Sequence, residues 1–319
     1  MSKDDIATAD RRRLEAKLAP IGQEHLLAFW DELNANERQH LARQIDKIDT
    51  NLFRDLKAEY KRNEGAGGDS KSKWAALAAR ADSPPAMRLD GSGVPFSRDA
   101  ARAKGAEVLR AGHVGMILVA GGLGTRLGID QPKGLFTLGP LSRRTLFQIL
   151  IERLLAIRRR YGLRIPLYVM TSPATDDATR QFLDEHHWFG LPAEDGRIFC
   201  QATMWAVDDR FERILLESPG SLFTGPDGHG GMLAALEKSG CLADSQRRGL
   251  KYLFYGQIDN PLLQVCDESF LGSHVLAGSQ MTTQVVKKRE PLERVGNVVS
   301  IDGKVHVIEY TDLPDDFAR

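Results

Sequence analysis

The residues from Val114 to Gly128 decide the fold, and they read VGMILVAGGLGTRLG. The first seven form a nearly continuous apolar run, which is typical of a strand buried on both faces of a sheet. The rest is a glycine-rich turn that directly follows this strand. In open α/β sheets, ligands collect at the carboxyl ends of the strands. This turn is therefore the first candidate for a binding site.

Further apolar runs extend this strand into a sheet. They cover residues 166–171, 197–201 and 251–258, and a helical pattern occupies 146–157. Strands that alternate with helices predict βαβ crossovers and a mostly parallel sheet with helices on both faces. After Met281 the strands become shorter. There Asp302-Gly303 predicts a hairpin turn between 298–301 and 305–308.

The first third of the chain has a different pattern. Apolar residues recur at helical spacing over 23–33 and 41–56 and predict helices. The segment Glu64–Ser72 is polar and rich in glycine, which is typical of a flexible linker. We therefore expect a helical region over residues 1–112, with a linker near 64–72, and an α/β domain over 113–319.

Composition excludes several classes of protein. The 43 basic and 43 acidic residues give a formal net charge of zero, which argues against a general nucleic-acid binder. No apolar run approaches the roughly 20 residues of a membrane span. Cys200, Cys241 and Cys266 lack metal-binding or disulfide spacing and favour a reducing compartment. We expect a cytoplasmic globular protein without a nucleic-acid or membrane partner.

The glycine-rich turn Gly121–Gly128 admits three interpretations. Its glycines can serve only the geometry of a strand-to-helix turn. Alternatively, it forms a dinucleotide site, although its spacing has one residue too many before the last glycine. In the third interpretation it is a nucleotidyltransferase loop, in which adjacent glycines present N–H groups to phosphate oxygens. Arg126 and Lys133 add two cations nearby, and these favour the third interpretation.

The turn, together with Pro132-Lys133-Gly134, resembles the signature of the eukaryotic-type UDP-sugar pyrophosphorylases. The resemblance is greatest to the UDP-N-acetylhexosamine pyrophosphorylase branch and its bacterial relatives, and it covers most of the chain. Six further motifs match in order: Gly22–Trp30, Phe199–Gln201, Pro226–Gly231, Ile258–Asn260, Val295-Gly296 and Val307–Tyr310. The resemblance implies a Rossmann-like nucleotidyltransferase fold, with a mixed sheet flanked by helices and an N-terminal helical extension.

The resemblance also implies an activity. The family converts UTP and a sugar 1-phosphate into a UDP-sugar and pyrophosphate, assisted by Mg²⁺. The sugar phosphate oxygen attacks the α-phosphorus of UTP in line, so the protein has to position the reactants and neutralise charge. Within the family, a histidine at the position of His229 favours glucose 1-phosphate as the substrate. The whole set of motifs favours N-acetylglucosamine 1-phosphate.

Roles for individual residues on the nucleotide side follow from the resemblance. The backbone of Val119, Ala120, Gly121 and Gly122 is expected to lie against UTP. Lys133 is expected to contact its phosphates. Arg126 is a candidate clamp on the leaving pyrophosphate, because a guanidinium can bind two oxygens at once. Gln201 is expected to read the uracil edge, which the backbone of Gly228 also meets.

The resemblance assigns the metal and the sugar to other residues. Asp259 follows an apolar strand and is expected to hold Mg²⁺, which takes one or two carboxylates together with substrate phosphates. By itself, Asp259-Asn260-Pro261 also suits an ordinary turn. The predicted sugar contacts are His229, Gly296, Glu309 and Tyr310.

The end of the sequence leaves an alternative open. Members of the family continue beyond Tyr310 with more strands, a sugar-binding asparagine and a lysine near the reacting phosphates. We therefore expect a C-terminally truncated catalytic domain. The alternative function is a catalytically impaired fragment that binds uridine nucleotides. An NADP-dependent reductase, suggested only by the irregular glycine spacing, is a third hypothesis.

Overall fold

The computed structural model describes residues 3–65, 70–88, 90–139 and 141–311 of the chain. They divide into two compact units. Unit 1 comprises Met1–Ala86, Met204–Gly225 and Gln284–Arg319, and unit 2 comprises Met87–Thr203 and Pro226–Thr283. This division differs from the predicted boundary at residue 112, because two later segments of the chain pack with the N-terminal helices rather than with the sheet.

Unit 2 is built on a four-stranded sheet with the strand order β10-β1-β4-β5. Its strands are β1 (Val114–Val119), β4 (Leu167–Thr171), β5 (Gly196–Cys200) and β10 (Tyr252–Gln257). All neighbouring pairs are parallel. The predicted α/β fold and its four strands are therefore confirmed. The described antiparallel strands form separate two-stranded sheets, so the central sheet is parallel throughout rather than mixed.

Alternate side chains of the sheet point to opposite layers of helices. Met116 and Leu118 pack into one layer, and Ile117 packs into the other. The first layer comprises α5 (Arg98–Arg110), α6 (Leu146–Tyr161), α7 (Asp176–Glu185) and α10 (Glu268–Leu276), and the second comprises α8 (Met232–Lys238) and α9 (Cys241–Arg247). Burial of each large apolar side chain here contributes about 1.5–3 kcal/mol to the free energy of folding. The predicted helices on both faces are confirmed.

Helix α6 shows how local sequence sets the limits of an element. The side chain of Thr145 accepts a hydrogen bond from the Gln148 amide and caps the first turn. Gly162 adopts the left-handed conformation that ends the helix. The buried face of α6 extends from Leu146 to Leu154. The helix predicted over 146–157 is confirmed and continues for one more turn.

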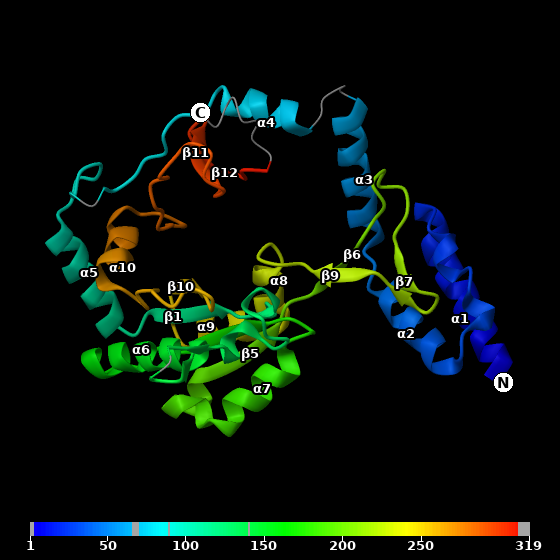
Figure 1. Ribbon diagram of the computed structural model, residues 1–319, viewed down its shortest axis with the longest axis horizontal. Helices are drawn as coiled ribbons and strands as arrows, with labels where there is room; N and C mark the ends of the chain where they lie inside the picture. The colour runs from blue at the N-terminus through cyan, green and yellow to red at the C-terminus, as the bar shows by residue number, and fades with distance from the viewer. Residues whose placement is uncertain (1–2, 66–69, 89, 140, 312–319) are drawn as a thin grey trace. The chain divides into compact units, whose positions relative to one another are not determined.

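Helices α5 and α10 lie side by side in unit 2 and approach unusually closely (Figure 1). A Cβ atom built on Gly105 would lie 1.8 Å from the backbone oxygen of Glu268. One built on Gly272 would lie 1.6 Å from the backbone oxygen of Ala101. Both distances are far shorter than a van der Waals contact. Only glycine therefore fits at these two positions.

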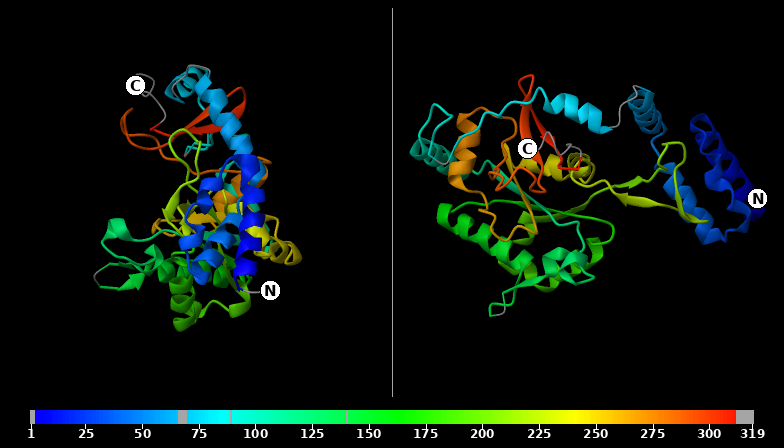
Figure 2. Two further views of the ribbon diagram at one scale, coloured as in Figure 1. Left: turned by 90° about the vertical axis from the view of Figure 1, so that its right-hand side faces the viewer. Right: turned by 45° about the horizontal axis from the view of Figure 1, so that its top comes forward.

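Unit 1 joins N-terminal helices to a later hairpin. The helices are α1 (Lys3–Leu18), α2 (Ala35–Asp46) and α3 (Thr50–Gly65), and the hairpin strands are β7 (Leu216–Ser218) and β8 (Ser221–Leu222). Figure 2 shows the blue helices beside the yellow-green strands. The buried Gln23 links the two parts, since its Oε1 accepts from the Ile214 amide at 2.7 Å and its Nε2 donates to the Glu212 carbonyl at 2.8 Å.

The helix predicted over 23–33 is wrong. The segment forms two short 3₁₀ turns, Glu24–Leu27 and Trp30–Glu32, between Gly22 in the left-handed region and Leu33 in an extended conformation. Leu26, Leu27 and Trp30 nevertheless lie in the core. A 3₁₀ turn repeats every three residues, so successive turns imitate the spacing of an amphipathic helix.

A smaller cluster of unit 1 packs helix α4 (Ser70–Ala78) against a hairpin. Strands β11 (Asn297–Ile301) and β12 (Lys304–Ile308) are antiparallel, and both residues of the Asp302-Gly303 turn have positive φ. This is the predicted hairpin, and it is confirmed. The predicted linker near 64–72 is helical at both ends, because α3 continues to Gly65 and α4 begins at Ser70. Residues 66–69 of that linker lie outside the described residues.

The remaining elements are short. The strands are β2 (Thr137–Leu138), β3 (Arg144–Thr145), β6 (Thr203–Trp205) and β9 (Thr224–Pro226), and the further 3₁₀ turns are η1 (Ala19–Ile21), η4 (Thr125–Leu127), η5 (Lys133–Leu135), η6 (His187–Gly190) and η7 (Ala193–Asp195). Within the described ranges, no helix combines the length and apolar character needed to cross a lipid bilayer.

A buried carboxylate fixes one end of unit 2 and makes it sensitive to acid. Asp195 is fully buried and pairs with Arg158 at 2.7 Å, with Arg164 and with Arg248 at 3.1 Å. Burial raises the pKa of Asp195, but hydrogen bonds from Arg164 and Arg158 outweigh it and hold that pKa below its usual range. This pairing therefore stabilises the protein at neutral pH. Its contribution is lost as the pH falls through the lowered pKa of the folded state.

Replacing Asp195 by asparagine should lower the free energy of unfolding at neutral pH by about 3 kcal/mol, because it leaves buried guanidinium groups without their counter-charge. Below about pH 4 the difference in the free energy of unfolding should narrow, because the wild-type carboxylate is then protonated in the unfolded state and, as the pH falls further, in the folded state as well. Denaturant unfolding at several pH values measures both effects. The control is Glu194→Gln, since Glu194 is exposed and should contribute about 0–1 kcal/mol. Equal losses for the two variants would contradict the prediction.

Candidate functional site

The glycine-rich loop after β1 is held on both sides. The Ala120 amide continues the strand pairing by donating to the Met170 carbonyl at 2.7 Å. The Gly121 carbonyl accepts from the Ser172 hydroxyl at 2.7 Å. Farther along, the Lys133 amide donates to the Gly122 carbonyl at 3.0 Å and closes the loop. The loop is therefore fixed at the carboxyl ends of β1 and β4.

The path of the chain after the loop excludes two of the three interpretations. The glycines lead into the 3₁₀ turns η4 and η5 and the β2–β3 pair, and the next α-helix begins only at Leu146. A dinucleotide fingerprint requires the glycine-rich segment to open a helix. A simple strand-to-helix turn requires the same. The third interpretation, a nucleotidyltransferase loop, is compatible with this path and stays a prediction.

Gly121 brings the loop backbone against Gln201. A Cβ atom on Gly121 would lie 2.6 Å from the Nε2 atom of Gln201 and 3.3 Å from the Ser172 backbone nitrogen. One on Gly122 would lie 3.4 Å from the Cε atom of Lys133. The two glycines therefore lie between an amide side chain and a cation.

Gln201 follows β5 and carries an unsatisfied acceptor. Its backbone amide donates to the Thr171 carbonyl at 2.9 Å, and the residue is only 6% exposed. Its Oε1 atom is buried and has no hydrogen-bond partner among the described residues. A buried acceptor without a partner costs about 1–3 kcal/mol. A ligand that supplies an N–H group would remove this cost.

Lys133 and Asp259 meet at the ends of the neighbouring strands β1 and β10. The Lys133 Nζ atom lies 2.9 Å from Asp259 Oδ2, and their side chains are 25% and 44% exposed. The Ile258 amide donates to the Val119 carbonyl at 3.0 Å, which keeps the two strand ends together. Residues far apart in the sequence thus form an ion pair that solvent, or a ligand, can reach.

The donor set at Asp259 fits a magnesium ion held jointly with a ligand. In the part of the chain that the structure describes, no three His, Cys, Asp or Glu residues gather as a metal site. Mg²⁺ is usually bound through one or two carboxylates, with substrate phosphates and waters supplying the rest. A single part-exposed carboxylate beside a lysine matches that arrangement rather than a preformed cage.

The loop Pro226–Gly231 lies beside Gln201, since the Asp227 amide donates to the Ala202 carbonyl at 3.1 Å. Gly228 has a φ of 62°, in the left-handed region that favours glycine. Asp227 Oδ1 is buried without a partner among the described residues, and burial raises the pKa of this carboxyl. The loop thus adds a second unsatisfied acceptor near the site.

The His229 side chain in the same loop contacts the sheet. Its Nδ1 atom is hydrogen-bonded to the hydroxyl of Tyr255 on β10. The two rings meet edge to face, with centroids 6.0 Å apart. The contact holds this loop against the strand that leads to Asp259.

Unit 2 contains most of the predicted site residues, at the carboxyl ends of β1, β5 and β10 or in the loop that lies beside Gln201. They are Val119, Ala120, Gly121, Gly122, Lys133, Gln201, Gly228, His229 and Asp259. Arg126 belongs to the same loop but is exposed, and no described residue forms a hydrogen bond or ion pair with it. The structure therefore does not connect Arg126 to the Lys133–Asp259 pair.

The other predicted sugar contacts lie in unit 1. Gly296 and Glu309 are adjacent at the open end of the β11–β12 hairpin, where a Cβ on Gly296 would lie 3.4 Å from Glu309 Oε1. Tyr310 follows and is 44% exposed. These residues form a separate group from those of unit 2.

Sequence reasoning missed Ser172, Asp227 and Tyr255. Ser172 directly follows a predicted strand, so the rule that ligands collect at carboxyl ends could have selected it. Asp227 lies inside the motif Pro226–Gly231 but carried no role there. Tyr255 lies within an apolar run, and nothing in the sequence distinguishes it from a core residue.

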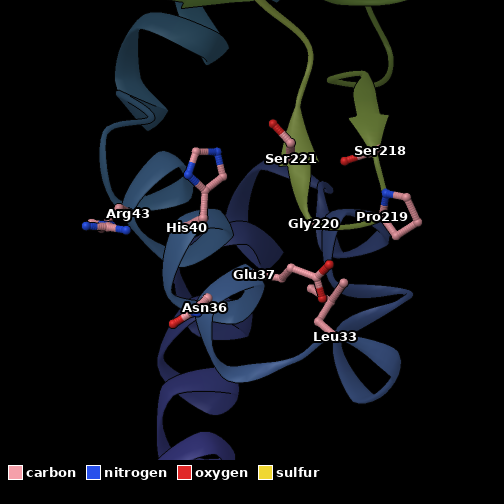
Figure 3. A pocket seen from close by; sticks show the side chains of 9 residues that line it. All are labelled: Leu33, Asn36, Glu37, His40, Arg43, Ser218, Pro219, Gly220 and Ser221. Atoms are coloured by element: carbon pink, nitrogen blue, oxygen red, sulfur yellow. The ribbon is translucent and has the colours of Figure 1, made fainter.

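Unit 1 also contains a hollow of about 540 Å³ between helix α2 and the β7–β8 hairpin (Figure 3). Its lining residues are Leu33, Asn36, Glu37, His40, Arg43, Ser218, Pro219, Gly220 and Ser221. None of these described residues belongs to the predicted site. The hollow therefore adds nothing to the assignment of a nucleotide site.

On the expectation that this loop lies against UTP, replacing Gly121 by alanine should weaken that binding about tenfold, because the added methyl group displaces the Gln201 amide from its position. The nearest clash is with the end of a side chain, so the protein should remain folded. Isothermal titration calorimetry measures the affinity, and a thermal melt checks the fold. Gly225→Ala is the matched control, since no described atom lies within 4 Å of a Cβ built there. An unchanged affinity for UTP would contradict the prediction.

Comparison with known proteins finds a matching family model and similar sequences. Residues 82–318 match the model of the UTP–glucose-1-phosphate uridylyltransferase family. The chain is 34% identical to UDP-N-acetylglucosamine diphosphorylase 1 of Arabidopsis thaliana, over 98% of this chain and 63% of the relative. It is 33% identical to the human UDP-N-acetylhexosamine pyrophosphorylase-like protein 1, over 98% of this chain and 62% of the relative. It thus spans less than two thirds of the length of these relatives.

A solved structure shows the same fold. The uridine diphosphate N-acetylglucosamine pyrophosphorylase from Trypanosoma brucei, determined in complex with an inhibitor, superposes with a TM-score of 0.78 at 30% sequence identity. The superposition covers 95% of this chain and 62% of the other.

Proposed function

The chain belongs to the UTP–glucose-1-phosphate uridylyltransferase family, and we propose that it transfers a uridylyl group from UTP to a sugar 1-phosphate. The products are a UDP-sugar and pyrophosphate. The Lys133–Asp259 pair, placed beside the exposed backbone of Gly122, is the single observation that carries this proposal. It supplies a cation for phosphates and a carboxylate for a metal, both at the carboxyl ends of neighbouring strands.

In the proposed reaction the protein binds and orients rather than forming a covalent intermediate. An oxygen of the sugar phosphate attacks the α-phosphorus of UTP, and the bond from that phosphorus to the β-phosphate oxygen breaks in line. Lys133 neutralises charge on the phosphates. Its ammonium group is held at the site by Asp259 until the phosphates bind. Gln201 and the Gly228 backbone meet the uracil, and the backbone of Val119–Gly122 lies along the nucleotide.

Asp259 is the proposed ligand for Mg²⁺. When bound, the ion would neutralise phosphate charge and help to orient the triphosphate. Transfer of Lys133 from the carboxylate to a phosphate would free Asp259 for this role. Arg126 is exposed and without a partner among the described residues, which is compatible with a proposed clamp on pyrophosphate.

The proposed sugar substrate is N-acetylglucosamine 1-phosphate or glucose 1-phosphate. His229, Gly296, Glu309 and Tyr310 are its proposed contacts. The names of the relatives, which refer to N-acetylglucosamine and N-acetylhexosamine, support the first of these sugars. The proposed location is the cytoplasm, in agreement with the three cysteines, which are free.

A direct assay tests the proposal. The protein is incubated with UTP, Mg²⁺ and either sugar 1-phosphate, and pyrophosphate is measured, while calorimetry measures UTP and UDP-sugar binding separately. Release of pyrophosphate that depends on the sugar phosphate would support the proposal. Binding of UTP without turnover would support the alternative of a nucleotide-binding protein. Absence of both would overturn the proposal.

A further inference from the structure

The contact between Tyr255 and His229 has no role in the function described so far. Tyr255 lies on β10, opposite Ile117 in the parallel pairing with β1, and is 38% exposed. Its hydroxyl meets Nδ1 of His229, which is in a different loop. No other described side chain makes a hydrogen bond to this imidazole. The ring therefore has one nitrogen engaged by the protein and one left for a ligand.

This hydrogen bond can run in two directions, since a phenol can donate to Nδ1 or accept from an Nδ1–H group. A phenol is protonated at neutral pH, and burial raises the pKa of Tyr255 further, with a contribution from the charge of Asp259. The hydroxyl therefore keeps a proton that it can donate to Nδ1. A neutral imidazole has one donor nitrogen and one acceptor nitrogen. A ring that accepts at Nδ1 consequently carries its proton at Nε2.

We propose that Tyr255 is a positioning residue that holds His229 as the Nε2–H tautomer, so that Nε2–H donates to the phosphate of the sugar 1-phosphate. This inference rests on the proposed function of the site. A phosphate oxygen is only an acceptor, so the other neutral tautomer would present it with a lone pair. In the Nε2–H form the ring therefore offers the phosphate a donor, and in the other neutral form it does not.

The strand itself offers a matched control. Tyr252, three residues before Tyr255, also meets a histidine edge to face, with ring centroids 5.7 Å apart. That histidine, His274, uses its Nδ1 for the Thr282 hydroxyl at 2.9 Å. Tyr252→Phe therefore removes a hydroxyl from the same strand without touching a histidine nitrogen in the site.

Nitrogen-15 NMR of the imidazole groups tests the tautomer without any need for turnover. In spectra recorded where the imidazole signals themselves report a neutral ring, wild type should show His229 protonated at Nε2 alone. Tyr255→Phe should show a mixture of both tautomers, and Tyr252→Phe should match wild type. A His229 signal that stays entirely Nε2–H in Tyr255→Phe would overturn the proposal.

Kinetics tests what the tautomer does. Tyr255→Phe should raise KM for the sugar 1-phosphate about three- to tenfold and leave KM for UTP unchanged, since one hydrogen bond to the substrate is weakened. If Tyr255 acts through His229, the same change should have no further effect in a His229→Ala background. An equal rise of KM in that background would overturn the proposal.

The NMR and kinetic experiments together distinguish a failure of this inference from a failure of the proposed function. If the wild-type protein neither binds UTP nor releases pyrophosphate, the proposed function fails and the phosphate role of His229 fails with it. The NMR result then still decides whether Tyr255 sets the tautomer. If wild type is active and only the sugar-phosphate KM responds to Tyr255→Phe, both stand.

Discussion

Lys133→Ala should lower kcat/KM for pyrophosphate release about 10²–10³-fold, the loss typical when a preorganised group that stabilises developing charge is removed. The ammonium group lies 2.9 Å from Asp259 and beside Gly122, so no other described cation occupies its place. Its removal also leaves the Asp259 carboxylate without a partner, and that charge then repels the triphosphate. The defect should therefore appear in both UTP affinity and turnover.

Steady-state pyrophosphate release, together with UTP titration by calorimetry, measures the Lys133→Ala defect. Lys104→Ala is the matched control, because it breaks an exposed lysine–carboxylate pair of similar length, Lys104–Glu107 at 2.7 Å, on helix α5. That variant should behave as wild type. A loss of less than about tenfold for Lys133→Ala would contradict the assignment of Lys133 to the phosphates.

Gly272→Ala should destabilise unit 2 by about 3 kcal/mol or more, the largest stability effect we expect from adding a single methyl group. Alanine favours a helix over glycine by about 1 kcal/mol. Here the methyl group would lie 1.6 Å from the backbone oxygen of Ala101, and backbone cannot rotate away as a side chain can. Helices α5 and α10 would have to separate, and overpacking of this kind commonly costs 1–3 kcal/mol or more.

Denaturant unfolding followed by a far-ultraviolet signal measures this loss. Ala103→Leu is the control, since Ala103 lies on the exposed face of α5 and leucine is nearly as good a helix former. Gly105→Ala should resemble Gly272→Ala, because a Cβ there would lie 1.8 Å from the Glu268 carbonyl. Wild-type stability for either glycine variant would contradict the close packing of the two helices.

The strands of unit 2 could be predicted because a buried parallel strand needs an uninterrupted apolar run. The run that ends at Ala120 and the one that ends at Ile258 predicted β1 and β10 to within one or two residues. Once these were parallel neighbours, their carboxyl ends had to meet. The meeting of Lys133 and Asp259 follows from that geometry, together with the loop that returns Lys133 to Gly122.

Other features depend on contacts that local pattern does not encode. The segment 23–33 has the spacing of a helix, yet the buried Gln23 bonds to Glu212 and Ile214 and the chain turns in 3₁₀ steps. Tyr255 lies in an apolar run that is typical of a core strand. Its contact with His229 is seen only in the structure. In each case the partner lies 26 or more positions away.

The interleaving of the two units restricts how this chain can be assembled. Unit 1 draws on three stretches of sequence and unit 2 on two, so the polypeptide passes from one to the other four times. No single cut yields both halves intact, and a fragment ending near residue 203 lacks Glu212 and Ile214, the hydrogen-bond partners of Gln23. During synthesis, the first helices emerge from the ribosome well before their packing partner, so a nascent chain exposes apolar surface that a chaperone could bind. Expression systems with abundant chaperones should therefore raise the yield of folded protein.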